Sequence, residues 1–537
     1  MDTFIDPGTR TTAAVEVRAV RQRTQGRTTL HDVSFSVAPG EVVAIVGGSG
    51  AGKTTLLETM IGIRPPAAGE VGIAGARDRS DVSYVPQDDI IHGDLPLART
   101  LRYAARLRLP AGTAPEAVDR IVAETLAALD LTERADVRVG SLSGGQRKRA
   151  SIAVELLTRP AAFFLDEPTS GLDPATAREV LRLLRRLAGA GTTIVLTTHS
   201  PSDIDLCDRI VFLARDGYLA FVGTPDEARQ YFESPDLTVA YERLALEETP
   251  ASWADRFAAL RGVDGESGPR APSAPDRSAA PPTRRVGPVR QWAVLTRRNG
   301  DLLVRNKLTL LVLAGSPALV IAMMAVLFRP GAFAPAGVAS GQATQTVFWL
   351  AFAGFFFGLT YGLLQIVGEM AILRRERLAG LDAAAYVLSK VAVLTPVLVA
   401  VAAAMLAVLR ALDRLPEASG GAYARLLVTL TLEAMAALAL GLLASASVAT
   451  AAQATLALPM LCFPQVLFAG AIVPVPEMAA PGRAMSYGLA NRWAFESLGR
   501  ALGLFAGRPA VGWAVLAGFV VVLLGATVAV LARRAPA

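Results

Sequence analysis

Cysteine is scarce in this chain of 537 residues, which contains only two. We expect Cys207 in a cytosolic segment and Cys462 inside a membrane segment, so the sequence predicts no disulfide. The first residues lack a basic stretch followed by an apolar run. We therefore expect a short N-terminal tail over residues 1–14 and no signal peptide.

The composition indicates more than one domain and a membrane part. Hydrophobic residues make up 52% of the chain and the mean hydropathy is +0.40, which is too apolar for a purely soluble enzyme. A net charge of +6 and an isoelectric point near 9.5 are also compatible with nucleic-acid binding. Many basic residues, however, flank apolar stretches, where they orient helices in a membrane. We therefore expect no nucleic-acid partner.

The first half of the chain predicts an α/β domain over residues 15–240. Short β-branched runs alternate there with helix-like stretches, a pattern that is typical of a largely parallel, buried sheet. We expect residues 241–288 to hold the tail of this domain and a flexible linker rich in Pro, Ser and Gly. Residues 289–307 predict an amphipathic connecting helix.

Residues 308–537 predict an all-α membrane domain. Four uncharged windows are as long as a membrane-crossing helix: Leu308–Phe328, Val347–Gly368, Val391–Leu409 and Ala510–Ala532. Leu426–Val475 is about twice the length of one span, and it divides near Ser445–Gln453, so we expect six spans. Its charged residue, Glu433, should face protein or water because a carboxylate in lipid is costly. Buried helices of a soluble protein are the disfavoured alternative.

Basic residues mark one side of this domain. Those before the first span, after the second and after the last fall on the same side of six spans: Arg297, Arg298, Arg305, Lys307, Arg374, Arg375, Arg377, Arg533 and Arg534. The positive-inside rule makes that side cytoplasmic. We therefore expect a multi-pass protein of the cytoplasmic membrane, with its N-terminal domain and its C-terminus in the cytoplasm. Six arginines on the other side make the bias imperfect.

A glycine-rich stretch, "GGSGAGKTT", predicts a phosphate-binding loop. It follows the apolar run "EVVAIV" and opens a helical one, which is the context of a P-loop. The residues expected to bind a nucleotide are Gly47, Gly48, Ser49, Gly50, Ala51, Gly52, Lys53, Thr54 and Thr55. Lys53 should reach the β- and γ-phosphates, and the Thr54 hydroxyl should bind Mg²⁺.

Further polar residues follow predicted strands. Asp166 and Glu167 end "AAFFLDE", where Asp166 should hold Mg²⁺ through water and Glu167 should act as the base for an attacking water. His199 ends the strand in "TTIVLTTHS" and is a candidate catalytic residue. Gln87, after "VSYVP", should complete the Mg²⁺ shell and sense the γ-phosphate. Because parallel strands end at the same edge of a sheet, we expect these residues to lie together.

Five motifs then give the chain a family resemblance. "GGSGAGKTT", Gln87, "LSGGQ", "FFLDEPTSGLD" and "TTHS" resemble the Walker A, Q-loop, signature, Walker B with D-loop, and switch histidine of an ABC-transporter ATP-binding domain. The resemblance implies ATP and Mg²⁺ as cofactors and a head-to-tail dimer in which one chain's signature completes the other chain's site. It also assigns nucleotide contacts to Ser143, Gly144, Gly145, Gln146 and Asp173.

One departure from that family concerns the base of the nucleotide. The family usually places an aromatic residue before the first strands to stack on adenine, but Val17–Arg23 contains none. An arginine that stacks on the base and a loosely held base are both open.

The domain order resembles the G subfamily of ABC transporters, the White and pleiotropic-drug-resistance type. "SGGQRKRASIAVELL" resembles its extended signature, and Glu369–Lys390 resembles its intracellular loop. The resemblance implies a homodimeric half-transporter that exports an amphipathic or lipid-like substrate across the membrane. An exporter of a polymer or glycolipid precursor and a membrane-anchored regulatory ATPase are the alternatives. We expect Glu369–Lys390 to couple ATP binding to movement, as a short helix that presents its charges.

Overall fold

The computed structural model describes residues 14–24, 26–74, 82–160, 162–246, 249–263, 286–335, 338 and 341–534. The chain divides into two compact units, residues 1–286 with 378–380, and residues 287–377 with 381–537. The predicted tail before residue 14 and most of the predicted linker lie outside the described residues.

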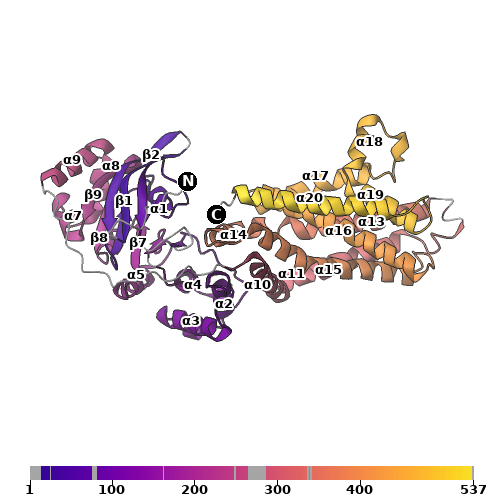
Figure 1. The fold of residues 1–537 in the computed structure, drawn as a ribbon, viewed down its shortest axis with the longest axis horizontal. Helices are drawn as coiled ribbons and strands as arrows, with labels where there is room; N and C mark the ends of the chain where they lie inside the picture. The colour runs from indigo at the N-terminus through magenta and orange to yellow at the C-terminus, as the bar shows by residue number, and fades with distance from the viewer. Residues whose placement is uncertain are drawn as a thin grey trace. The chain divides into compact units, whose positions relative to one another are not determined.

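A nine-stranded sheet lies in the first unit, in the order β4-β1-β2-β9-β8-β3-β7-β6-β5. Figure 1 shows part of this sheet with helices on either side of it. The strands are β1 Val15–Thr24, β2 Arg27–Val37, β3 Val42–Val46, β4 Ala68–Ile73, β5 Ser83–Val85, β6 Ala162–Leu165, β7 Thr193–Thr198, β8 Arg209–Ala214 and β9 Tyr218–Gly223. From β8 to β5 the strands are parallel. Every residue of β3, β6 and β7 is buried, as expected of strands covered on both faces. The predicted α/β fold is confirmed, with an antiparallel edge formed by β1, β2 and β4.

Helices connect and cover these strands. They are α1 Lys53–Met60, α2 Leu97–Arg108, α3 Pro115–Ala128, α4 Gly144–Leu156, α5 Pro174–Gly189, α6 Pro201–Ile204, α7 Pro225–Tyr231, α8 Leu237–Leu246 and α9 Pro250–Val263. In α5 the buried residues Val180, Leu181, Leu184 and Ala188 recur at helical spacing. This face packs on β3 and β7, so the sequence pattern of α5 accounts for its place on the sheet.

The tail of the first unit is folded further than the sequence indicates. Helices α8 and α9 continue the unit to residue 263, and Trp253 of α9 is buried against Phe232 and Tyr231. The predicted tail therefore begins as part of the core.

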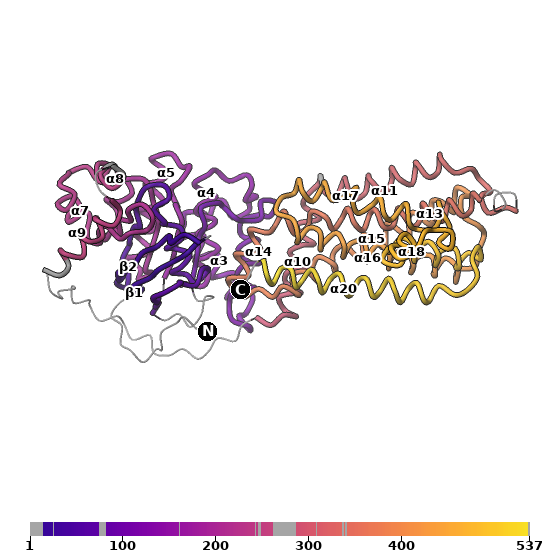
Figure 2. The backbone as a smooth tube through the Cα atoms, turned by 90° about the horizontal axis from the view of Figure 1, so that it is seen from above, coloured from indigo at the N-terminus to yellow at the C-terminus, as the bar shows by residue number. Residues whose placement is uncertain are grey.

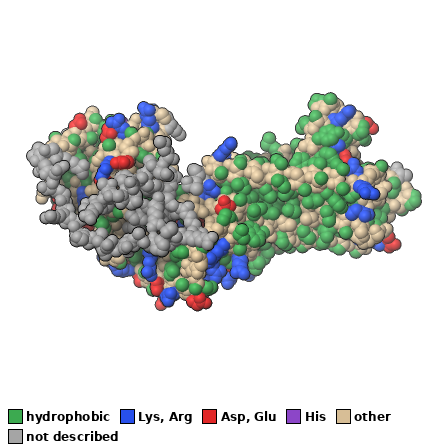
Figure 3. All heavy atoms as spheres, in the orientation of Figure 1, with side chains coloured by type: hydrophobic (Ala, Val, Ile, Leu, Met, Phe, Trp, Pro, Cys, Tyr) green, Lys and Arg blue, Asp and Glu red, His purple; other side chains and the backbone are tan. Residues whose placement is uncertain are grey.

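The second unit is a bundle of long helices that lie side by side (Figure 2). Its helices are α10 Pro288–Arg305, α11 Lys307–Leu327, α13 Gln342–Leu363, α14 Met370–Leu378, α15 Ala383–Ala411, α16 Gly420–Ser447, α17 Ala451–Leu467, α18 Ala480–Tyr487, α19 Ala490–Ala501 and α20 Ala510–Arg534. Figure 3 shows hydrophobic side chains covering the visible face of this bundle. Such a surface suits a bilayer, because apolar side chains can lie against lipid tails instead of water.

The six predicted spans correspond to α11, α13, α15, α16, α17 and α20. Within the described residues, five helices are long and apolar enough to cross a membrane. The sixth, α17, has 17 residues with Pro459 and Pro464 inside it. The break between α16 and α17 falls within the predicted division at Ser445–Gln453.

Helices α13 and α16 pack closely because small residues face each other. A Cβ on Gly358 would lie 2.1 Å from the Ala434 carbonyl oxygen, and one on Gly362 would lie 2.6 Å from the Leu438 carbonyl oxygen. Glu433 of α16 is fully buried beside Gly354 of α13. It therefore faces protein, as the sequence predicts.

A buried polar network joins α10 to the segment between α13 and α15. The guanidinium of Arg298 donates to both carboxylate oxygens of Glu376, with 3.0 Å between Nη2 and Oε2. Glu369 accepts from the Tyr386 hydroxyl at 3.0 Å and lies 2.7 Å from the Lys390 ammonium. The charges of Arg298, Glu376, Glu369 and Lys390 are thus paired with opposite charges.

This network changes the interpretation of Glu369–Lys390. The predicted short helix exists as α14, but Glu369 and Glu376 bind inside the second unit, and Arg375 and Arg377 are buried. Two of its charges are therefore paired within the second unit, and the expectation that the helix presents several charges to the ATP-binding unit stays a prediction. Arg374 is the exposed charged residue of α14.

Replacement of Gly358 by Ala should destabilise the second unit, because the added Cβ would meet a backbone oxygen that cannot move without separating α13 from α16. Overpacking costs about 1–3 kcal/mol in well-packed cores. We expect a lower midpoint of thermal unfolding in detergent, followed by fluorescence-detected size-exclusion chromatography. Gly518→Ala in α20 is the matched control, since nothing lies within 4 Å of its Cβ position. Equal midpoints for the two variants would contradict the packing.

Candidate functional site

The loop between β3 and α1 depends on glycine where other backbone comes close. A Cβ on Gly47 would lie 2.4 Å from the Leu213 carbonyl oxygen. Gly52 caps α1 in the left-handed region, with φ of 88°, and a Cβ there would lie 2.9 Å from the Thr29 carbonyl oxygen. The loop is therefore held against β8 and β2, and its amides sit at a helix N-terminus, which favours an anion.

Lys53 lies over this loop. Its ammonium is buried and donates to the carbonyl oxygens of Gly47 and Gly48, at 2.9 and 3.1 Å. Burial lowers the pKa of Lys53 from its ordinary value, and the carboxylates of Glu167 and Asp166 oppose that shift. The side chain is thus placed at the mouth of the loop, where phosphate oxygens can replace the carbonyls as acceptors.

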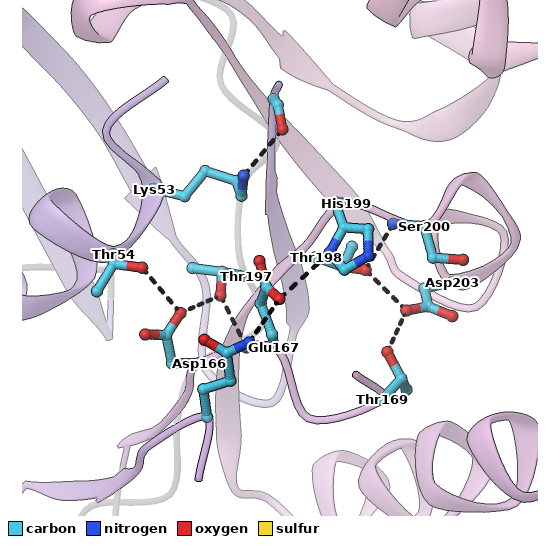
Figure 4. A network of polar contacts seen from close by, with 12 residues as sticks. Lys53, Thr54, Asp166, Glu167, Thr169, Thr197, Thr198, His199, Ser200 and Asp203 are labelled. Carbon is cyan, nitrogen blue, oxygen red and sulfur yellow. Dashed lines mark hydrogen bonds and ion pairs between the residues drawn. The ribbon is translucent and has the colours of Figure 1, made fainter. Parts of the chain in front are cut away.

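Asp166 forms the centre of a cluster of oxygen atoms. One carboxylate oxygen accepts from the Thr54 hydroxyl at 3.3 Å and from the Thr197 hydroxyl at 2.6 Å (Figure 4). Hard cations such as Mg²⁺ prefer oxygen ligands and are usually bound by one or two protein carboxylates together with water and phosphate. The donor set of Thr54 and Asp166 therefore fits Mg²⁺ beside a nucleotide.

Glu167 is held in place from three sides. Its backbone N–H donates to the Thr197 hydroxyl at 2.9 Å, and its φ of 43° lies in the left-handed region. Its Oε2 accepts from Gln87 Nε2 at 3.3 Å and lies 3.2 Å from His199 Nδ1. Residues that follow β5, β6 and β7 thus meet at one edge of the sheet, as the sequence predicts. A carboxylate fixed in this way is suited to accept a proton from water.

A second buried network supports the loops around Glu167 and His199. The carboxylate of Asp203 accepts from the hydroxyls of Thr169 and Thr198, at 2.6 and 2.7 Å, and Ser200 N–H donates to the Thr198 hydroxyl (Figure 4). Sequence reasoning missed this network and Thr197. The signal available for Thr197 and Thr198 was a hydroxyl pair that follows the apolar run Ile194–Leu196 at the end of β7.

The P-loop residues line a cavity of about 650 Å³. The lining residues are Thr29, Ser49, Gly50, Gly52, Lys53, Thr54, Thr55, Glu167, His199 and Asp216. Thr29 and Asp216 were not predicted from the sequence. The lining contains no Phe, Tyr or Trp, so the described residues of this cavity offer no such ring for a base.

The predicted signature does not contribute to this lining. Ser143 caps α4 instead, where its hydroxyl accepts from Gln146 N–H at 3.3 Å and its own N–H donates to Gln146 Oε1 at 3.1 Å. A Cβ on Gly145 would lie 2.3 Å from Thr176 Cγ2, so only glycine lets α4 approach α5. Gly144 begins α4 and is exposed. The N-terminus of α4 is thus free of the chain's own cavity.

Asp173 caps α5 in the same manner. Its carboxylate accepts from the N–H groups of Ala175 and Thr176, each at 3.1 Å. Hydrogen bonds from Thr176 are the main reason that the pKa of Asp173 is lowered. The nucleotide contact that the sequence assigns to Asp173 stays a prediction.

Comparison with known proteins agrees with this arrangement. Residues 30–170 match the family described as ABC transporter, and residues 290–532 match the family described as ABC-2 type transporter. An ABC transporter ATP-binding/permease protein of Mycobacterium tuberculosis is 33% identical over 90% of this chain and 57% of its own length.

Two further relatives match over a shorter part of the chain. ABC transporter G family member 13 of Arabidopsis thaliana is 37% identical over 38% of this chain and 32% of its own length. The broad substrate specificity ATP-binding cassette transporter of Rattus norvegicus is 37% identical over 40% of this chain and 34% of its own length. The chain thus spans just over half of the mycobacterial relative and about a third of the other two. With both of its units matched in order, the chain belongs to the ABC transporters, as a member in which the ATP-binding domain precedes an ABC-2 type membrane domain.

Proposed function

We propose that this chain hydrolyses ATP as a homodimer and uses the reaction to export an amphipathic or lipid-like molecule across the cytoplasmic membrane. The observation that carries the proposal is the convergence of Lys53, Thr54, Asp166, Glu167 and His199 on one edge of the sheet. An apolar helical bundle in the same chain supports transport rather than a soluble ATPase.

The residues divide the chemistry among them. The P-loop amides and Lys53 bind the phosphates, and Thr54 and Asp166 would hold a Mg²⁺ ion, which would supply positive charge to the phosphate groups. Glu167 accepts a proton from the attacking water. His199 and Gln87 orient Glu167 and are placed to respond to the γ-phosphate.

A dimer follows from the position of the signature. Residues 143–146 lie outside the cavity lined by the P-loop, so a single chain supplies a signature that its own site does not use. The N-terminus of α4 carries an exposed glycine and aligned amides, which suit the γ-phosphate bound to a second copy. Since Glu167 and the signature are both intact, two copies of one chain form two equivalent sites.

The substrate class rests on the membrane unit and on relatives. The bundle presents a hydrophobic surface (Figure 3), and one relative is named for broad substrate specificity. A polymer or glycolipid precursor as substrate and a regulatory ATPase without transport are the competing functions. The test compares the lipids and metabolites of cells that make the wild-type protein with those of cells that make Glu167→Gln. A lipid whose distribution differs between the two cell types supports lipid export, a polymer or glycolipid precursor that differs supports the second function, and no difference supports the regulatory ATPase.

Replacement of Glu167 by Gln should lower ATP turnover by roughly 10²-fold to 10⁴-fold, since the amide keeps the shape but cannot take a proton from water. Binding of a fluorescent ATP analogue, measured by titration, should remain near the wild-type value. Glu179→Gln is the matched control, because Glu179 is an exposed residue of α5. Near-normal turnover in Glu167→Gln would assign the base to another residue.

Reversal of the charge at Arg374 should uncouple ATP hydrolysis from export. Arg374 is the exposed charge of α14, so Arg374→Glu leaves the buried pair of Arg298 and Glu376 intact. We expect basal ATP hydrolysis in proteoliposomes to persist, while stimulation by transported lipid is lost.

The control for Arg374→Glu makes the same charge reversal at another arginine on the predicted cytoplasmic side. Arg533 is exposed at the end of α20, and Arg533→Glu should keep substrate stimulation. Cysteine accessibility of the termini checks that both variants keep their orientation in the membrane. Full lipid stimulation in correctly oriented Arg374→Glu would refute the role of α14.

A further inference from the structure

Lys148 is a buried lysine on the helix that carries the signature. It stands five residues after Ser143 on α4, and its exposed fraction is 3%. Its ammonium donates to the backbone carbonyl of Gln87 at 2.7 Å and forms an ion pair with Asp89 at 3.2 Å. An ammonium in such a place requires partners, because burial without them is costly. Both partners belong to the segment around Gln87.

The same face of α4 is attached to β5 at a second point. Ser83 at the start of β5 donates its hydroxyl to the Glu155 carbonyl oxygen at 3.2 Å. Glu155 lies seven residues, about two turns, after Lys148, so both contacts are on one side of the helix. Arg108 of α2 also binds both carboxylate oxygens of Glu155, at 2.7 and 2.9 Å. Helix α4 is therefore held at two points, about two turns apart. Of these contacts, the one made by Lys148 ends on Gln87, whose side chain binds Glu167.

Gln87 has two connections of different kinds. Its side chain donates to Glu167 in the chain's own ATP site, and its backbone carbonyl accepts from Lys148. A change at the γ-phosphate that moves Gln87 therefore also moves Lys148 and its helix. Because an α-helix shifts as a rigid rod over a few turns, the displacement reaches Ser143, about 7.5 Å away along the axis.

We propose that Lys148 couples the two ATP sites of the dimer by linking Gln87 of one site to the signature helix that completes the other. The inference rests on the proposed function, since it needs a dimer with shared sites. Lys148 is not among the residues that line the P-loop cavity and is a positioning residue. Its role is to make occupancy of one site change the affinity of the second, which is a coupling free energy between sites.

The test uses ATP hydrolysis by purified full-length protein over a range of ATP concentrations. The wild type should show a Hill coefficient above one, with about two as the limit for two sites. Lys148→Met keeps the apolar stem and removes the donors, and its Hill coefficient should fall to one. Binding of a fluorescent ATP analogue at low occupancy should stay within about twofold of the wild type, because the P-loop is unchanged. Lys148→Arg, which keeps the charge and the donors, should restore cooperativity.

Two further variants separate coupling from general loosening of α4. Ser83→Ala removes the hydrogen bond between Ser83 of β5 and Glu155 of α4 and should keep the wild-type Hill coefficient. Asp89→Asn removes the ion pair but keeps the lysine and its bond to Gln87, so a partial loss is expected even if Lys148→Met does not fold. Three results would overturn the proposal. The wild type could show a Hill coefficient of one, or Lys148→Met and Asp89→Asn could both keep the wild-type Hill coefficient. The third is a Hill coefficient that falls as far in Ser83→Ala as in Lys148→Met. Absence of any ATP hydrolysis by the wild type would instead overturn the proposed function.

Discussion

The parallel run of β3, β7 and β6 is the constraint on which the ATP-binding unit depends. Because these strands point the same way, the P-loop, Glu167 and His199 all follow strand ends at one edge of the sheet. Thr197 then bonds to Asp166 and to the Glu167 amide, which joins the proposed metal-binding residue to the proposed base. The close approach of Gly47 and Gly52 to β8 and β2 fixes the loop against the same edge. Loss of this parallel order would separate residues that the proposed function requires at one phosphate.

The signature belongs to a different part of the same unit. Helix α4 is capped at Ser143, packed on α5 at Gly145 and attached to the Gln87 segment by Lys148. These contacts present its N-terminus away from the cavity that the P-loop lines. In the proposed dimer, such a chain contributes halves of two different ATP sites, and a second copy completes each. In the membrane unit, the buried pair of Arg298 and Glu376 has a comparable structural role, because it fixes the connecting helix α10 to α14.

The sequence predicts the parts of this site that short motifs carry. Lys53, Asp166, Glu167 and His199 each follow an apolar strand, so their meeting at one sheet edge could be expected before the structure was known. Long-range partners carry no such pattern. Nothing in the sequence near Glu376 shows that it binds Arg298, 78 residues away. Asp203 and Lys148 were missed for the same reason, because their partners are set by packing rather than by spacing.

The central claim is that each ATP site is made from two chains, and mixed dimers test it most directly. Lys53→Ala damages the P-loop, and Gly144→Asp places a negative charge at the exposed start of α4. When the two changes are on different chains, one site of the mixed dimer is intact, and we predict about half of the wild-type ATP hydrolysis, because one of two equivalent sites remains. When both changes are on one chain and its partner is wild type, both sites are damaged, and we predict almost none. The reverse pattern would show that each chain completes its own site and would contradict the account.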